Sequence, residues 1–272
     1  MAEPTVKQGN KYFANTLYEG NGTAIGSGGK TITGLEFQPD FTWIKNRDAA
    51  DSHSLYDSSR GVTKQIESDN TSAQTTESEG LTSFTSDGFT LGSLDQVNTN
   101  NESFVGWNWK ANGGSTTTND ASSTGIGTID SVYQANTTSG FSIVQYTGTG
   151  SAGTIRHGLS VAPSLIIVKN LSQGDAWKVY HHKVASDPQT DYLVLNTTAA
   201  PVDDATVWND TAPTNSVFSI GNHTDVNTNT ENYVAYCWNE VEGFSKFGKF
   251  VGNGTDTDGP FIYTGFKPAF II

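Results

Sequence analysis

The chain of 272 residues contains one sequence pattern twice and then opens it a third time. The block Gly34–Asn46 recurs as Gly158–Asn170, and Pro163 lies 124 positions after Pro39. A repeat of this length constrains the fold more than any other feature of the sequence. About 125 residues is near the size of an independent domain, roughly 100 to 150 residues. It far exceeds the repeats of solenoids and propellers, at roughly 20 to 50 residues.

A second block repeats in the same order. Asp95–Trp109 recurs as Thr224–Trp238 at an offset of 129 residues, and Tyr263–Ile272 reopens the first block. The order of the blocks is kept while the loops between them change length. We therefore expect a tandem array of modules, each with a core of its own.

These repeats predict the domain organisation. The segment between the two modules is rich in Gly, Ser and Thr, a composition typical of a flexible surface linker. We expect an N-terminal arm at 1–13, module 1 at 14–111, the linker at 112–139, module 2 at 140–242, and the start of a truncated third module at 243–272.

Charge narrows the range of partners. The chain has 28 acidic and 15 basic residues, a net charge of −13, and its basic residues form no stripe. Proteins that bind nucleic acid present a basic face to the phosphates, and anionic lipid attracts basic segments. We therefore predict no nucleic-acid binding and no membrane insertion, and we expect neutral polymers, cationic groups or other proteins as partners.

Hydropathy and cysteine content add two expectations. There is no run of 18 apolar residues and no apolar leader at the start, so we predict neither a membrane span nor secretion through a leader. Cys237 is the single cysteine, which excludes an intrachain disulfide. We expect its side chain to be buried in a strand.

The polar residues are mainly Asn, Thr, Ser and Gly, and aromatic residues make up 11% of the chain. This composition favours strands and turns, and no window of 12 residues has a helical stripe. Ser103–Trp109 and Asn232–Trp238 alternate as strands do, and we expect the face with Val105, Trp107 and Trp109 to be the core face. Further strands are predicted at 41–45, 83–91, 140–146, 165–169, 177–181, 191–195, 216–220 and 247–251. The predicted fold is all-β, with tandem β-sandwich modules of jelly-roll or concanavalin-like type.

No residue pattern identifies a catalytic site. The five histidines do not fall at equivalent positions in the two modules, whereas a duplicated site would repeat its ligands. Glu240 and Glu242 could face the same side of a strand, as a glycosidase acid pair would, but module 1 has Ala111 in place of Glu240. We predict no enzyme activity and no cofactor.

Oxygen ligands for a metal are present in one repeated loop. Asp95 and Asn98 are matched by Asp225 and Asn227, with one aspartate shifted by a position. Calcium prefers such ligands, but tight turns use the same residues without a metal. We predict no metal, and these four residues are the candidates if one is bound.

Aromatic side chains could stack on sugars. Trp208 lies in an acidic loop with Asp204 and Asp210, and we expect it to be an exposed platform for a ligand. Core packing accounts for most of the other candidates, which are Trp43, Tyr56, Trp177 and Tyr180.

Several longer stretches carry a family resemblance. They are Lys11–Gly22, Phe37–Arg47, His53–Gly61, Gly80–Gly92 and Val241–Gly254. In these stretches the sequence resembles a repeat family of structural proteins in marine tailed phages, such as those of cyanobacteria and related ocean bacteria. The second module departs from the pattern around 180–182.

The resemblance implies a virion protein of tail-fibre type that serves host attachment. It further implies assembly in the host cytoplasm, a homotrimer, and docking of the N-terminal part on tail, adaptor or nozzle proteins. Two alternatives remain open: a carbohydrate-binding adhesin or decoration module that contacts host surface glycan, and a polysaccharide-degrading tail spike. The resemblance assigns no catalytic or ligand-binding residue to this chain.

Overall fold

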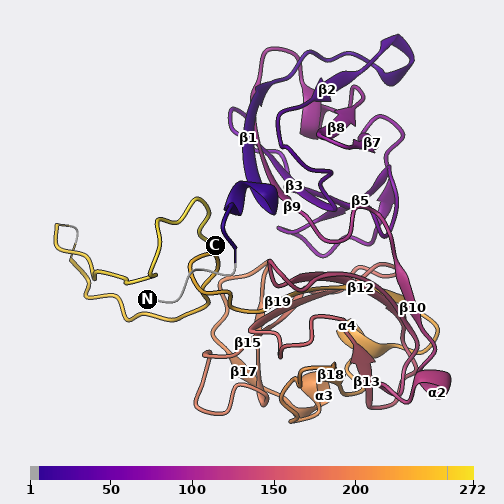
Figure 1. Ribbon diagram of the computed structural model, residues 1–272, viewed down its shortest axis with the longest axis vertical. Coiled ribbons are helices and arrows are strands. Elements are labelled where there is room, and N and C mark those ends of the chain that lie inside the picture. Colours follow the sequence, from indigo (N-terminus) through magenta and orange to yellow (C-terminus); the bar gives the residue numbers. More distant parts are fainter. Residues whose placement is uncertain (1–5, 256) are drawn as a thin grey trace.

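The computed structural model describes residues 6–255 and 257–272 and consists of antiparallel β-sheets stacked in layers (Figure 1). A three-stranded sheet lies on a six-stranded sheet, which in turn lies on an eight-stranded sheet, and a two-stranded sheet closes the stack. The prediction of an all-β sandwich is confirmed.

The first half of the chain forms the upper two layers in Figure 1. Its strands are β1 (Phe13–Glu19), β2 (Lys30–Ile32), β3 (Phe41–Asn46), β4 (Ser54–Asp57), β5 (Lys64–Glu67), β6 (Thr75–Thr76), β7 (Leu81–Thr85), β8 (Gly88–Leu91) and β9 (Ser103–Trp109). The six-stranded sheet has the order β1-β9-β3-β4-β5-β6, and the three-stranded sheet has the order β2-β8-β7.

The second half forms the lower two layers. Its strands are β10 (Thr117–Asn119), β11 (Ser131–Asn136), β12 (Phe141–Thr147), β13 (Gly153–Arg156), β14 (Leu165–Asn170), β15 (Lys178–His181), β16 (Asp191–Val194), β17 (Val202–Asp203), β18 (Val217–Ile220) and β19 (Asn232–Trp238). The eight-stranded sheet has the order β10-β11-β12-β19-β14-β15-β16-β17, and β13 pairs with β18.

Helices are short and lie between strands. They are η1 (Gly9–Lys11), η2 (Ile25–Ser27), α1 (Asp95–Asn98), α2 (Ala121–Thr124), α3 (Ala205–Trp208) and α4 (Thr224–Asn227). In the described part of the chain, none is long and apolar enough to cross a bilayer.

The two large sheets share one strand order. In the first half, β9 lies between β1 and β3, and in the second half β19 lies between β12 and β14. We call β1 and β12 the opening strands. Residues 94–109 and 223–238 are called the closing blocks, because each contains the last strand of its half, which completes the sheet. The pairing is long-range: Phe13 pairs with Trp109, and Phe141 pairs with Trp238.

Each half has an outer core, and the two halves share a third, central core. The first outer core lies between the six- and three-stranded sheets, and the second lies between the eight- and two-stranded sheets. The central core joins side chains of both large sheets, including Phe41, Trp109, Phe141 and Trp238. The large sheets therefore pack face to face.

The predicted core face of β9 is the less buried of its two faces, although its Trp109 lies in the central core. In β9 the buried positions include Phe104, Gly106 and Asn108, while Val105 and Trp107 are only half-buried. In β19 every residue after Asn232 is buried. A strand covered on both sides loses the alternation that marks a half-exposed strand. Cys237 is buried in this strand, as predicted.

Polar contacts also cross the central core. The Tyr236 hydroxyl donates to Asp57 Oδ2 at 2.6 Å, and the same carboxylate pairs with Arg60 at 2.5 Å. The Trp177 indole N–H donates to the Glu67 carbonyl at 2.9 Å. Since buried polar groups are costly unless paired, these contacts fix how one sheet sits on the other.

The segment at 112–139 is not the flexible linker that its composition predicted. It contains β10, α2 and β11, and β11 pairs along its whole length with β12. Its start is fastened to the first half, because the buried Asp40 carboxylate accepts backbone N–H groups of Ala111, Gly113 and Gly114 at 2.7 to 2.8 Å. The segment belongs to the eight-stranded sheet.

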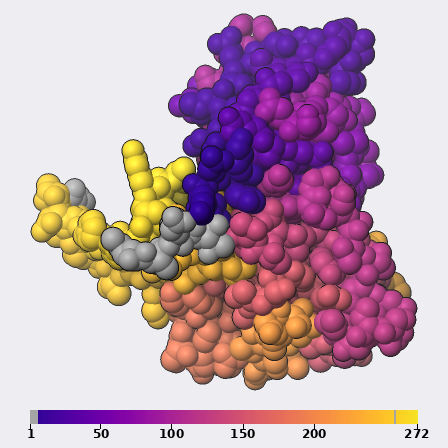
Figure 2. All heavy atoms as spheres, viewed as in Figure 1, coloured from indigo at the N-terminus to yellow at the C-terminus, as the bar shows by residue number. Residues whose placement is uncertain are grey.

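The two ends of the chain also differ from the prediction. Residues 1–5 of the predicted arm lie outside the described residues, 9–11 form η1, and Phe13 already begins β1. No named strand forms within the described part of 243–272, including the predicted strand at 247–251. This C-terminal segment projects from the side of the stack (Figures 1 and 2).

Candidate functional site

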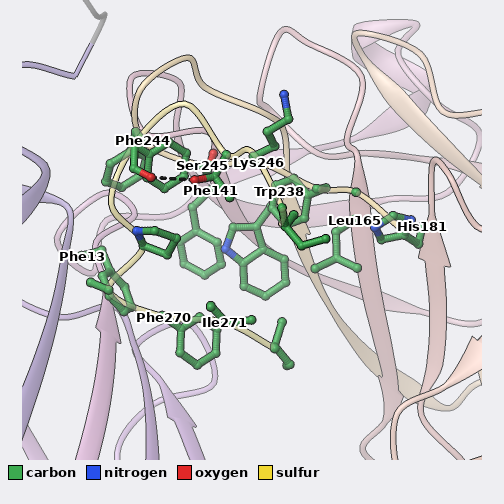
Figure 3. A pocket seen from close by; sticks show the side chains of 18 of the residues that line it. Phe13, Phe141, Leu165, His181, Trp238, Phe244, Ser245, Lys246, Phe270 and Ile271 are labelled. Carbon is green, nitrogen blue, oxygen red and sulfur yellow. Dashed lines mark hydrogen bonds between the residues drawn. The ribbon is translucent and has the colours of Figure 1, made fainter. Parts of the chain in front are cut away.

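A large aromatic groove lies where the two large sheets meet the C-terminal segment. It has a volume of about 1720 Å³ and is lined by strands of both halves and by residues 243–250 and 261–272. Figure 3 shows Phe141 and Trp238 side by side in its wall, with Phe13 and Phe270 nearby. The groove is the candidate functional site.

Strand register gathers the aromatic residues here. Phe13, Trp109 and Phe41 form one row across β1, β9 and β3. Phe141, Trp238 and Leu165 form the corresponding row across β12, β19 and β14. The rows meet, because the Trp109 and Trp238 ring centroids are 6.1 Å apart.

The rings are close enough to support one another. Phe13 lies 4.9 Å from Trp109, and Phe141 lies 5.0 Å from Trp238, both in tilted arrangements. Aromatic pairs at such distances are worth about 0.5 to 1.5 kcal/mol beyond the area they bury. The wall of the groove is thus a stable apolar surface.

The C-terminal segment partly fills the groove. Phe270 packs against Trp109 at 5.3 Å, Trp107 at 5.4 Å and Phe13 at 5.9 Å. By contrast, the neighbouring Ile271 is 83% exposed. The groove therefore accepts an aromatic side chain from an extended segment.

The polar side chains at the edge of the groove belong to the second half of the chain, and we call them the polar rim. Glu240 Oε1 is 3.3 Å from Lys183 Nζ and 3.7 Å from His182 Nε2, and it accepts the Phe247 N–H at 3.0 Å. Partial burial alone would raise the pKa of Glu240, but the Phe247 N–H and the Lys183 ammonium together hold that pKa below its ordinary value. The rim anchors the beginning of the C-terminal segment.

This arrangement does not support the acid pair considered for hydrolysis. β19 ends at Trp238, so Glu240 and Glu242 do not alternate on a strand. A general acid needs a raised pKa, whereas the pKa of Glu240 is lowered.

The prediction that Trp208 is an exposed platform is wrong. Trp208 is only 2% exposed and packs against Tyr180, with ring centroids 6.0 Å apart. Asp204 caps α3 by accepting the Thr206 N–H at 2.8 Å, and Asp210 is exposed beyond the helix. The capped turn points the indole inward, so the three residues form no surface site. The four other aromatic candidates are buried, as core packing predicted: Trp43, Tyr56, Trp177 and Tyr180.

Asn98 and Asn227, named as metal candidates, hold loops together. Asn98 Oδ1 accepts the Asn21 N–H at 2.9 Å, and its amide group donates to the Gly92 carbonyl at 2.7 Å. Asn227 repeats these bonds with the Thr149 N–H and the Gly221 carbonyl at 2.8 and 2.6 Å.

The aspartates of the same loops are not arranged around an ion. Asp95 is exposed, and Asp225 lies 3.3 Å from Lys178. Among the described residues, no three His, Cys, Asp or Glu side chains gather as a metal site would require.

Sequence reasoning missed the groove. The signal for the groove is an aromatic residue at the first or last position of a strand, as at Phe13, Trp109, Phe141 and Trp238. The sequence predicts a separate core for each module, because nothing local to a strand shows that two sheets will stack.

Comparison with known proteins gives one match. Residues 8–272 match a family described as a domain of unknown function, DUF7483. Neither the curated proteins nor the solved structures contain a match. Because the match covers nearly the whole chain, the chain belongs to the DUF7483 family.

Proposed function

We propose that this chain is a structural protein of a tailed-phage virion, in the tail-attached part of a tail fibre that serves host attachment. The observation that carries the proposal is the face-to-face stacking of the two large sheets through one central aromatic core. The sequence resemblance to phage structural repeats supports it.

A shared core suits a load-bearing part. Two domains on a flexible linker would move independently, whereas Asp57, Arg60 and Tyr236 tie the halves through buried polar contacts. The segment between the halves is itself part of a sheet. Because the two halves are held rigidly together, a fibre built from such units would keep one orientation relative to the tail.

The direct test is cryo-electron microscopy of intact virions that carry this protein. Three copies in each fibre, with the N-terminal half nearest the tail, are expected. Single copies on the capsid, or no density in the particle, would contradict the proposal.

The groove favours carbohydrate binding as a second candidate function. Aromatic faces stack on sugar rings, and Phe270 occupies the groove without filling it. If the groove binds glycans, replacing Phe270 by Ser should increase binding on a glycan array. Unchanged or lost binding would count against the groove as a sugar site.

A further inference from the structure

The C-terminal segment exposes an unusual concentration of large apolar side chains. Among the described residues, seven of the twelve exposed large apolar side chains fall within 250–272. They are Phe250, Val251, Phe261, Ile262, Tyr263, Ile271 and Ile272. Exposed apolar patches of this kind mark interaction surfaces.

The segment matches the opening of the repeat residue by residue. Phe250 stands two positions before Gly252, as Tyr18 stands before Gly20 and Tyr146 before Gly148. In all three places a second glycine follows two positions after the first, at Gly22, Gly150 and Gly254. The segment therefore carries a third copy of the opening-strand sequence and of its glycine loop, although it forms no strand here.

In both halves, the closing block covers this aromatic position. Tyr18 stacks on Phe104 with centroids 5.1 Å apart and an interplanar angle of 9°. Tyr146 stacks on Tyr233 with centroids 5.1 Å apart at 11°. Phe250, at the equivalent position, is 66% exposed.

The glycine loop also depends on the closing block. The Gly22 and Gly150 N–H groups donate to the Asn98 and Asn227 carbonyls at 2.8 and 2.9 Å. A side chain on Gly20 would lie 2.0 Å from the Thr99 carbonyl oxygen, so this position must be glycine.

Among the described residues of the third copy, the hydrogen bonds of the glycine loop stay within the loop's own segment. Asn253, between the two glycines, donates to the Asp258 carbonyl and accepts the Thr255 N–H. Both partners lie within the C-terminal segment.

Phe270 repeats the pattern at the next strand. It stands two positions after Pro268, as Phe41 follows Pro39 and Leu165 follows Pro163. Phe41 and Leu165 pair with Trp109 and Trp238 of the closing strands. Phe270 instead packs against Trp109 of the first half, whose own sheet is already complete.

We propose that residues 247–254 and 268–272 are an acceptor for a closing block of the same repeat type, supplied by a partner segment whose strand is not already built into a sheet. The partner is a peptide segment that contains an Asn and, six residues later, an aromatic residue. The aromatic residue lies in an extended stretch that ends in Trp. It would insert between the stretch around Phe250 and the stretch around Phe270, and both would become strands on binding. Strand insertion of this kind gains main-chain hydrogen bonds along with side-chain pockets.

A folded second copy cannot supply this partner. β9 and β19 are central strands, each already hydrogen-bonded on both sides within its own sheet. The inference does not depend on the virion proposal, since it concerns only which chemistry completes the segment.

The test uses the full chain and a synthetic peptide of residues 94–111, which spans the first closing block. Hydrogen exchange of the amides at 247–254 and 269–272 should slow at least tenfold when the peptide is added. Unchanged exchange in both stretches at millimolar peptide would overturn the proposal.

Matched variants sharpen the test. Phe250→Asp should weaken peptide binding at least tenfold, and because Phe250 is exposed the variant should still fold. Val251→Thr should not change binding, since Glu19 and Thr147 at the equivalent positions are exposed in both halves. A peptide carrying Asn98→Ala and Phe104→Ser should fail to protect. Equal binding by Phe250→Asp and the original chain would also overturn the proposal.

Discussion

Tyr236 of the second half donates its hydroxyl proton to Asp57 of the first half, 179 residues earlier, across the centre of the molecule. Both side chains are almost completely buried, and burial raises the pKa of the Tyr236 hydroxyl well above its usual value, so it stays a donor. Arg60 pairs with the same carboxylate. These three residues hold the two sheets in one relative position.

Replacing Tyr236 by Phe should lower the free energy of unfolding by about 1 to 3 kcal/mol, because it leaves a buried carboxylate with one donor fewer. Urea unfolding followed by tryptophan fluorescence measures the change. Tyr263→Phe is the matched control, since Tyr263 is 75% exposed. Equal stability of the two variants would contradict the assignment.

Replacing Arg60 by Met should cost about 3 to 5 kcal/mol, since it leaves the Asp57 charge buried without its cation. Arg47→Met, at an exposed position, should change stability little. Removing both charges in Arg60→Met with Asp57→Leu should recover part of the loss. If the double variant is less stable than Arg60→Met alone, the ion pair is not the source of the effect.

Trp208→Ala should destabilise the chain by about 3 to 5 kcal/mol, the usual cost of removing a buried aromatic side chain. Its thermal midpoint would fall, whereas Tyr263→Ala should leave the midpoint nearly unchanged. A Trp208→Ala variant with unaltered stability would show that the side chain is not buried in solution.

Acid should weaken the fold through His157. Burial lowers the pKa of His157 to about 4, despite the hydrogen bond to the Thr214 carbonyl. Between pH 6.5 and about 4 the unfolded chain takes up a proton there and the folded chain does not, so stability falls as pH falls. The full loss is about 3 kcal/mol.

The measurement is the urea midpoint at several pH values between 7 and 4. In His157→Asn, this part of the pH dependence should disappear. The same dependence in the variant and the original chain would assign the acid sensitivity to other groups.

Strands were predictable because their signal is local. Runs such as Leu165–Asn170 are apolar and β-branched, follow a proline, and form strands as expected. The region 83–91 was expected to form one strand but forms the hairpin β7 and β8, which turns next to Gly88 at a φ of 157°. Here the Asp-Gly pair, which favours a turn, interrupts a run of residues that favour a strand.

The stacking of the sheets was not predictable in the same way. Gly/Ser/Thr composition indicated a linker, yet β11 gains order from pairing with β12. Trp208 stands among acidic residues, but the Asp204 cap and the positive φ values of Asn209 and Asp210 turn its side chain inward. In both places a contact distant in sequence, or a local backbone turn, overrides composition.

The central claim is that the two halves share one core and behave as one rigid unit. Differential scanning calorimetry of the full chain tests it most directly. If the halves share one core, the chain should unfold in a single transition in which the calorimetric and van't Hoff enthalpies agree. Two separate transitions, or a calorimetric enthalpy about twice the van't Hoff value, would show that the halves unfold independently and would contradict the claim.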